Sequence, residues 1–174
     1  MHRRILIVAS MMALAAVLLL GLGMLAGVAP PGYTRVDLTE GEKGRVLLSD
    51  VLRDGERITL TWRNSQFGLD VTEVFFARSG VIIQDRVVFA IPGGAPPPRV
   101  SPGEVADLFH TGGPFDARGI SRPFSRIVYR VGEIGNPRMQ IGERTVWFKK
   151  EAGFGGRVVL TAARPVLYEI LLDR

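Results

Sequence analysis

The sequence contains no cysteine and only two histidines among its 174 residues. Without cysteine, disulfide frameworks, thiol catalysis and cysteine-ligated zinc are excluded, while the redox compartment stays open. His2 lies at the N-terminus, so His110 is the only histidine in the rest of the chain. The common zinc ligand sets cannot be assembled from one histidine, and no acidic loop matches a calcium pattern. No metal and no cofactor are expected.

A strong excess of charge of one sign is also absent. The formal net charge is +5, and Arg3 and Arg4 at the N-terminus supply two of these charges. The remaining excess is too small to predict a nucleic-acid partner. The arginines are spread along the chain, which favours solvated strand faces over a phosphate-binding patch. A weak attraction to anionic lipid headgroups stays open.

Charged residues are missing from residues 5–29, which follow Arg3 and Arg4 directly. A helix of about 25 residues reaches about 37 Å and spans a bilayer. The basic start places the N-terminus in the cytoplasm and the following domain outside it. A cleavable signal has the same polarity, but the long apolar run and the proline at Pro30 favour an uncleaved anchor. Residues 1–29 are therefore predicted to hold the protein in the cell membrane.

Proline and glycine at Pro30, Pro31 and Gly32 end the apolar run. Residues 30–44 are predicted to form a polar linker. Residues 45–174 are predicted to form one domain, because their number fits a single core that folds without disulfides.

Short segments rich in Val, Ile, Phe and Thr follow, separated by turn signals. Ile58, Leu60 and Trp62 alternate with polar residues, as expected when one face of a sheet meets a core. Asp54-Gly55 and Ser79-Gly80 suit tight hairpins. With no competing long amphipathic helix, the pattern predicts a mostly β domain, an antiparallel sandwich or barrel of about eight strands. The expected strands are residues 45–52, 56–63, 69–78, 81–91, 124–131, 144–149, 156–162 and 166–172.

Most of the prolines and many glycines of the domain lie in residues 92–123, which predicts a long loop. Its apolar members indicate that the loop packs onto the sheet. Within it, Ser101-Pro-Gly-Glu104 is typical of a helix start, so a short helical turn is expected through Phe109.

Catalytic motifs are absent as well. A serine hydrolase would have to use His110 with a serine such as Ser65, Ser101, Ser121 or Ser125, yet no Gly-x-Ser-x-Gly elbow is present. The glycines around Gly94 lack the Lys-Ser/Thr pair of a phosphate loop and are better explained as turn residues. The chain is expected not to be an enzyme.

Glu73 lies inside an otherwise apolar run, residues 71–77. Alternation alone leaves two possibilities, because both faces of this strand carry apolar residues. If Glu73 points into the core, it needs a partner, and Arg63, Arg86 or Arg130 in neighbouring strands could serve. Such a pair would be either structural or part of a ligand site.

The order of several short motifs resembles a family of small proteins that are encoded beside TAXI-type TRAP transporters, which pair an extracytoplasmic solute receptor with membrane subunits. The residues that carry this resemblance are Leu60-Thr-Trp-Arg-Asn-Ser65, Val71-Thr-Glu-Val-Phe75, Asp85-Arg86, Gly93-Gly-Ala95, Tyr129-Arg-Val-Gly132 and Asn136-x-Arg138. They extend over about residues 45–165. No activity is established for the family, so the resemblance implies an accessory role near transport.

The resemblance also marks individual positions as candidate ligand- or partner-binding residues. Carried over by position, they are Ser65, Glu73, Arg86, Gly94 and Arg130. Asn64 stands where the family usually has histidine, and Gln66 stands where it has an aliphatic residue, so a role that needs an imidazole is not expected here.

Three functions are compatible with this pattern. The first is a membrane-anchored, extracytoplasmic, non-enzymatic accessory protein that binds a TRAP transporter subunit or its receptor. The second is a domain that binds a small anionic solute, with the 92–123 loop as a lid and Arg86 or Arg130 beside Glu73. The third is an envelope hydrolase that uses His110 and a nearby serine, which requires a hydrogen-bonded pair.

Overall fold

The computed structural model describes residues 31–172 and the single positions 12, 17, 18, 21 and 27. Apart from those single positions, the expected membrane helix within residues 5–29 lies outside the described part of the chain. Among the residues that are described, none of the helices combines the length and the apolar character needed to cross a bilayer.

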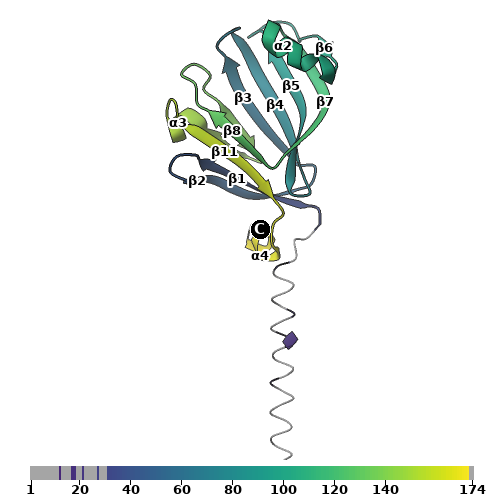
Figure 1. The fold of residues 1–174 in the computed structure, drawn as a ribbon, viewed down its shortest axis with the longest axis vertical. Coiled ribbons are helices and arrows are strands. Elements are labelled where there is room, and N and C mark those ends of the chain that lie inside the picture. The colour runs from purple at the N-terminus through teal and green to yellow at the C-terminus, as the bar shows by residue number, and fades with distance from the viewer. Residues whose placement is uncertain (1–11, 13–16, 19–20, 22–26, 28–30, 173–174) are drawn as a thin grey trace, which may run out of the picture.

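The described chain folds into two β-sheets that face each other (Figure 1). The small sheet consists, in spatial order, of β2 (Val46–Arg53), β1 (Tyr33–Glu40), β11 (Arg157–Ala163) and β8 (Arg126–Arg130). The large sheet consists of β10 (Arg144–Trp147), β9 (Arg138–Ile141), β3 (Arg57–Asn64), β4 (Leu69–Arg78), β5 (Val81–Ala90), β7 (Phe115–Phe124) and β6 (Arg99–Val100). The mostly β prediction is confirmed, and the two sheets do not close into a barrel.

The main core lies between the two sheets. Its members come from alternate positions of the strands, so that one face of each sheet is buried against the other sheet. In β4, Phe75 and Ala77 point inward opposite β3, and in β11 Val158 and Leu160 do the same from the other sheet. Phe148 begins the short helix α3 (Phe148–Ala152) and closes one end of this core. Burial of these side chains is the main source of stability.

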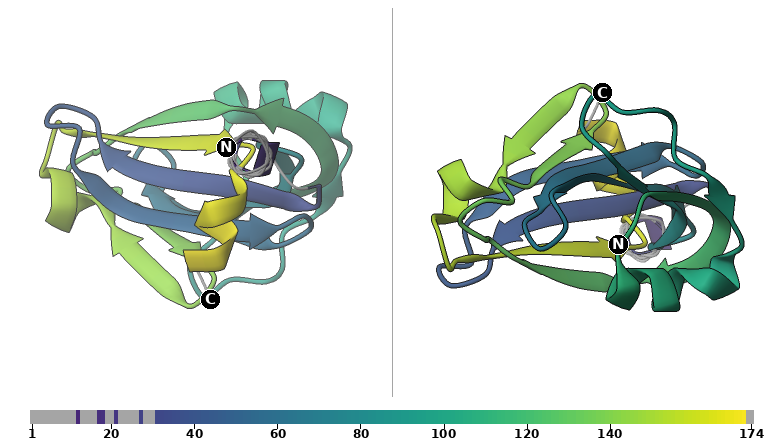
Figure 2. Two further views of the ribbon diagram at one scale, coloured as in Figure 1. Left: turned by 90° about the horizontal axis from the view of Figure 1, so that it is seen from below. Right: turned by 90° about the horizontal axis from the view of Figure 1, so that it is seen from above.

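A second, smaller core lies over the other end of the large sheet. Phe89 and Phe115 stack with their ring centroids 4.8 Å apart, and Phe109 meets Phe89 edge to face at 5.0 Å. Phe109 belongs to α2 (Val105–Thr111), which continues the 3-10 turn η1 (Pro102–Glu104). The views from above and below in Figure 2 show this helical segment against the edge of the large sheet.

The predicted long loop at 92–123 is wrong in most of its length. It contains β6, η1, α2 and all of β7 except Phe124, and the β7 residues Phe115 and Ala117 are fully buried. The prediction failed because β7 carries Gly119, Ser121 and Pro123, and the first two adopt positive φ angles in an irregular stretch of the strand. The helical turn was predicted correctly.

The start of that turn also follows the expectation. The Glu104 carboxylate accepts hydrogen bonds from the Ser101 amide at 2.8 Å and from the Ser101 hydroxyl at 2.6 Å. These contacts hold the first turn in place, and they lower the pKa of Glu104.

The predicted linker at 30–44 is also wrong, because β1 occupies its centre. Thr34, Val36, Leu38 and Glu40 alternate with more exposed residues and point inward. β1 pairs with β2 on one side and β11 on the other, so it is a central strand of the small sheet. The prediction failed because the segment contains many polar residues, although buried and more exposed positions alternate regularly along it with period two.

The turn at Asp54-Gly55 does not form the expected hairpin. β2 and β3 lie in different sheets, so this turn carries the chain from the small sheet to the large one. Ser79-Gly80 does form a hairpin between β4 and β5, with positive φ at both residues. The two turns meet, because Asp54 accepts hydrogen bonds from the amide and the hydroxyl of Ser79 at 2.9 and 3.1 Å.

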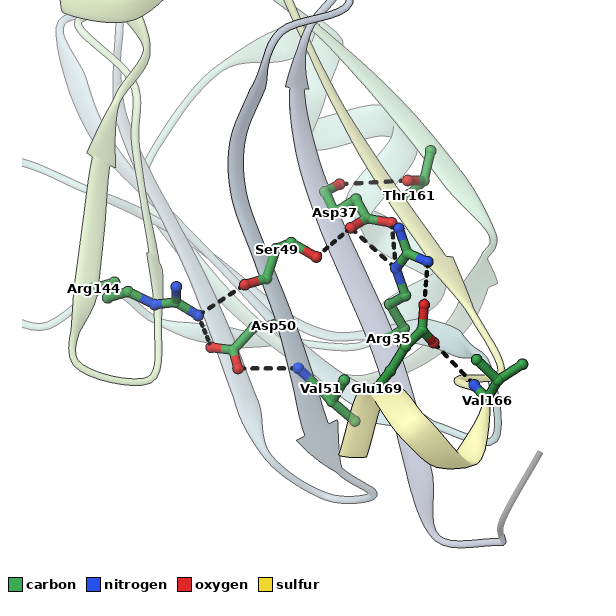
Figure 3. A network of polar contacts seen from close by, with 9 residues as sticks. All are labelled: Arg35, Asp37, Ser49, Asp50, Val51, Arg144, Thr161, Val166 and Glu169. Atoms are coloured by element: carbon green, nitrogen blue, oxygen red, sulfur yellow. Dashed lines mark hydrogen bonds and ion pairs between the residues drawn. The ribbon is translucent and has the colours of Figure 1, made fainter. Parts of the chain in front are cut away.

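Residues 166–172 were predicted as a strand but form the helix α4 (Leu167–Leu172). Figure 3 shows why the helix is held: Glu169 accepts a hydrogen bond from the Val166 amide at 2.9 Å and pairs with Arg35 of β1. Arg35 also pairs with Asp37. A short apolar run does not distinguish a strand from a helix, so only these tertiary contacts decide. The strands β1, β6, β7 and β9 were not predicted, so with the seven predicted strands that do form, the described part of the chain has eleven.

Candidate functional site

A cleft of about 430 Å³ lies where the two sheets part, between β3 and β4 of the large sheet and β8 of the small sheet. Figure 1 shows these strands diverging toward that end of the molecule. The segment 132–137, which connects β8 to β9, forms one wall. The polar side chains that line the cleft include Asn64, Ser65, Glu73, Tyr129 and Arg130.

Glu73 lies on the floor of the cleft because its strand register turns it inward. It is opposite Leu60 of β3 and Val87 of β5, and both of these are buried. Its Oε1 accepts a hydrogen bond from Trp62 Nε1 at 3.0 Å, and its Oε2 accepts one from Gln84 Nε2 at 2.8 Å. Burial raises the pKa of Glu73, and the two hydrogen bonds oppose that shift.

A β-bulge supplies one of these two donors. Val74 is opposite Arg86 and the next residue, Phe75, is opposite Gln84, so Asp85 is an extra residue in β5. If the three residues alternated regularly, Gln84 and Arg86 would lie on the same face, because side chains alternate with period two along a strand. The bulge therefore brings the Gln84 amide to Glu73 while Arg86 stays outside.

Tyr129 approaches the same floor from the small sheet. It lies opposite Val158 of β11 on the inner face of β8. Its hydroxyl oxygen is buried and has no hydrogen-bond partner among the described residues. Burial and the nearby negative charge of Glu73 raise the pKa of Tyr129. The floor of the cleft thus combines a satisfied carboxylate with an unsatisfied hydroxyl, which is costly to leave unpaired.

The strand β8 is an open edge of the small sheet and borders the cleft. Val131 exchanges two hydrogen bonds of 2.9 Å with residues 155 and 156, and the Ser125 carbonyl accepts one of 2.8 Å from Ala162. In an antiparallel ladder, every second residue turns both backbone groups to its partner. The backbone groups of Arg126, Val128 and Arg130 therefore point away from β11, toward the side where the sheet ends.

The five residues marked by the resemblance fall into two groups. Ser65, Glu73 and Arg130 line the cleft. Arg86 lies on the outer face of the large sheet, opposite Val74, and Gly94 donates its amide to the Ile91 carbonyl at 2.9 Å in the turn after β5. Arg86 therefore does not pair with Glu73, and the sheet separates the two side chains.

Arg86 instead forms an ion-pair cluster with two residues of β7. Asp116 accepts hydrogen bonds from Arg86 Nε at 2.6 Å and from Arg86 Nη2 at 2.9 Å, and Arg118 Nη2 lies 2.9 Å from the same carboxylate. These guanidinium groups lower the pKa of Asp116 to about 2. The arrangement is saturated by its own members, which is typical of a structural cluster.

The hydrolase arrangement is not formed in the described part of the chain. His110 is exposed in the last turn of α2 and makes no hydrogen bond to a serine among these residues. Nor do the described acidic and histidine side chains form a group that could hold a metal ion.

Comparison with protein-family models, with curated proteins and with solved structures gives no significant match. The resemblance to the TRAP-associated family therefore stays a prediction.

Three residues that shape the site were not among the predicted ones: Trp62, Gln84 and Tyr129. The alternation of β3 placed Trp62 inside, and this signal could have identified it as a donor to Glu73. In β8, the more buried Ile127 and Tyr129 alternate with exposed residues, and this pattern could have placed Tyr129 on the inner face. No sequence signal could have found Gln84, because its orientation depends on the bulge at Asp85.

Replacement of Glu73 by glutamine tests the burial of this carboxylate. Because the folded pKa of Glu73 is raised, its contribution to stability is complete at low pH and is lost as the pH rises through the folded pKa. We therefore expect Glu73→Gln to be more stable than the wild type at neutral pH, with the difference shrinking toward about pH 4. Urea unfolding of the full-length wild type and variant, at neutral pH and near pH 4, measures this stability difference. The exposed Glu42→Gln is the control. A variant less stable than the wild type at every pH would contradict the account.

Proposed function

We propose that the domain is a docking module that binds an extended segment of a partner protein along β8, beside the cleft. The observation that carries the proposal is the open edge: β8 ends the small sheet, and three of its residues turn their backbone groups outward. An extended segment can add to such an edge as a further strand, held by main-chain hydrogen bonds. The cleft next to β8 leaves space for side chains of that segment.

The opposite edge of the small sheet offers a useful contrast. There, Arg144 of β10 pairs with Asp50 of β2 and donates a hydrogen bond of 3.1 Å to the Ser49 carbonyl (Figure 3). These contacts tie β2 to the large sheet. At the β8 edge, by contrast, Val128 is 43% exposed and Ile134 is 64% exposed. Proteins usually protect an open edge, so exposed apolar side chains beside one support a binding role.

The partner and the place follow from the sequence. We propose that residues 1–29 anchor the chain, so that the domain works at the outer surface of the cell membrane. A tether raises the effective concentration of a weak binder near its partner. From the resemblance, the partner is a TRAP transporter subunit or its receptor. Purification of the full-length protein in mild detergent should bring such a component with it, and recovery of other membrane complexes without it would count against this partner.

A proline at position 128 tests the docking mode. On an edge strand, proline is tolerated where the amide points away from the sheet, as that of Val128 does. We expect Val128→Pro to fold and to lose binding of a seven-residue probe peptide with alternating threonine and glutamine. Val128→Ala keeps the amide and should keep the binding. Binding is read by NMR titration of the full-length protein, and a folded proline variant that binds the probe as well as the wild type would overturn the proposal.

A second function is favoured by the floor of the cleft. The unpartnered Tyr129 hydroxyl, the buried Glu73 and the exposed Arg130 are spaced around one cavity. A small solute with a carboxylate for Arg130 and a hydrogen-bond donor for the Tyr129 hydroxyl oxygen would give both groups a partner, whereas Glu73 already accepts two hydrogen bonds. An amino acid, with its carboxylate and its ammonium donor, fits this description, whereas the sequence led to the expectation of an anionic solute.

Replacement of Tyr129 by phenylalanine separates this second function from the first. The variant removes an unpaired buried hydroxyl, so we expect a free protein at least as stable as the wild type. Amino acids should raise the thermal midpoint of the wild type and raise that of Tyr129→Phe less. Equal shifts in the two proteins, or no shift with any amino acid, would exclude the solute.

A further inference from the structure

The charge pattern of the β8 edge indicates the chemistry of the partner. Arg130 lies directly opposite Arg157 of β11. Because Val131 and Gly156 form a hydrogen-bonded pair, Arg130 and Arg157 form a non-hydrogen-bonded pair, in which side chains come closest. Like charges in this position destabilise a sheet. Arg126 lies on the same outer face, four residues away along β8.

Six of the other thirteen arginines in the described part of the chain pair with an acidic side chain, whereas these three do not. Arginines that pair with an acidic side chain there are Arg35, Arg45, Arg63, Arg86, Arg118 and Arg144. Arg126, Arg130 and Arg157 make no side-chain hydrogen bond or ion pair with any described residue, and all three are exposed. The positive charge of this edge is thus both concentrated and unneutralised.

We propose that the segment docked on β8 is acidic, with an acidic residue at both ends of a five-residue stretch and an apolar residue at its centre. This inference rests on the docking mode proposed above. In a strand added to β8, the residues opposite Arg126, Val128 and Arg130 share the outer face, because side chains alternate with period two. A carboxylate opposite Arg130 also lies next to Arg157, and an apolar side chain covers Val128.

The pattern reads the same in both directions along the chain. It therefore applies whether the added strand runs parallel or antiparallel to β8. A carboxylate at each end converts a repulsive arrangement of arginines into an attractive one, so the preference for acidic segments should be strong at low salt and should decrease as salt is added.

The test compares three peptides that differ only at positions 2 and 6. Each has seven residues with threonine at positions 1, 3, 5 and 7 and valine at position 4, and positions 2 and 6 are glutamate, glutamine or lysine. We expect the full-length protein to bind the glutamate peptide at least about tenfold more tightly than the glutamine peptide at low salt. The lysine peptide should bind least. The double variant Arg130→Glu/Arg157→Glu should prefer the lysine peptide, and the exposed Arg78→Glu should behave as the wild type.

The outcomes distinguish the two proposals. If the glutamate and glutamine peptides bind with equal affinity and Val128→Pro binds neither, the preference for an acidic segment is refuted but the docking mode stands. Binding of none of the peptides would refute the docking mode itself. If Val128→Pro still binds the glutamate peptide, the arginines attract anions without strand pairing, and both the docking mode and the acidic segment are overturned.

A measurement without peptide gives a further check. Arg157→Glu should raise the thermal midpoint, because it replaces a like-charge pair with Arg130. A lowered midpoint would contradict repulsion between Arg130 and Arg157.

Discussion

Replacement of Phe75 by alanine is expected to lower the free energy of unfolding by about 3 to 5 kcal/mol. Phe75 is 1% exposed and belongs to the core between the two sheets, opposite Ile58 of β3. The substitution removes the ring and leaves a cavity that neighbouring strands can fill only in part. Urea unfolding of the full-length protein at neutral pH measures the effect.

The chain offers a matched control for this substitution. Phe154 is 69% exposed in the segment between α3 and β11. Phe154→Ala makes the same chemical change outside the core and should alter the free energy of unfolding by no more than about 0.5 kcal/mol. Equal losses for the two variants would contradict the placement of the main core.

Asp116→Asn is expected to destabilise the protein by about 2 kcal/mol at neutral pH and to change how stability depends on acid. The folded pKa of Asp116 is about 2, against an ordinary value of 3.8, because Arg86 and Arg118 donate to it. A lowered pKa contributes stability that is complete above the ordinary value and is lost as the pH falls through the folded value. The wild type should therefore lose this contribution between about pH 4 and about pH 2, and the variant should lack that loss.

The exposed pair of Arg63 and Asp70 provides the comparison. Their side chains are 45% and 55% exposed and meet at 3.2 Å. Asp70→Asn should cost less than about 1 kcal/mol, because a surface ion pair contributes little. If Asp116→Asn cost no more than Asp70→Asn and kept the acid dependence of the wild type, the Asp116 cluster would not hold β5 and β7 together.

The hairpin of β4 and β5 shows what local pattern can predict. The bounds of both strands were predicted to within one residue, and Ser79-Gly80 fits the positive φ angles of its turn. β1 and β7 were missed for the opposite reason: polar residues in one and Gly119 and Pro123 in the other weaken the local signal. Their position is decided by pairing with strands distant in the sequence, which a local pattern does not contain. The same holds for α4, which depends on the pair of Arg35 and Glu169.

The candidate site was predicted in part. Alternation left the direction of Glu73 open, and the structure turns it inward with Trp62 and Gln84 as donors instead of an arginine. A bulge of one residue at Asp85 reverses the alternation of β5, so neither the position of Gln84 nor that of Arg86 could be read from the sequence. The open edge at β8 was equally hidden, because it depends on the order of strands in the small sheet.

Together, the proposed anchor, the open edge and the unpaired arginines are consistent with one mode of action. A domain held near its partner needs only a modest affinity, and a free strand edge gives such an affinity without a deep pocket. The arginines Arg126, Arg130 and Arg157 would then select acidic segments over others. On this account the cleft receives inward-pointing side chains of the bound segment, so Glu73 and Tyr129 would influence which side chain is accepted there.

Amide hydrogen exchange of β8 shows whether a bound segment pairs with this strand. In the free protein, the amides of Arg126, Val128 and Arg130 should exchange fast, and those of Ile127 and Tyr129, which face β11, should exchange slowly. When the glutamate peptide is added, amide exchange should slow at Arg126, Val128 and Arg130. It should change little at Ile127 and Tyr129. Peptide binding that leaves Arg126, Val128 and Arg130 in fast exchange would show that the segment does not pair with β8 and would contradict the account.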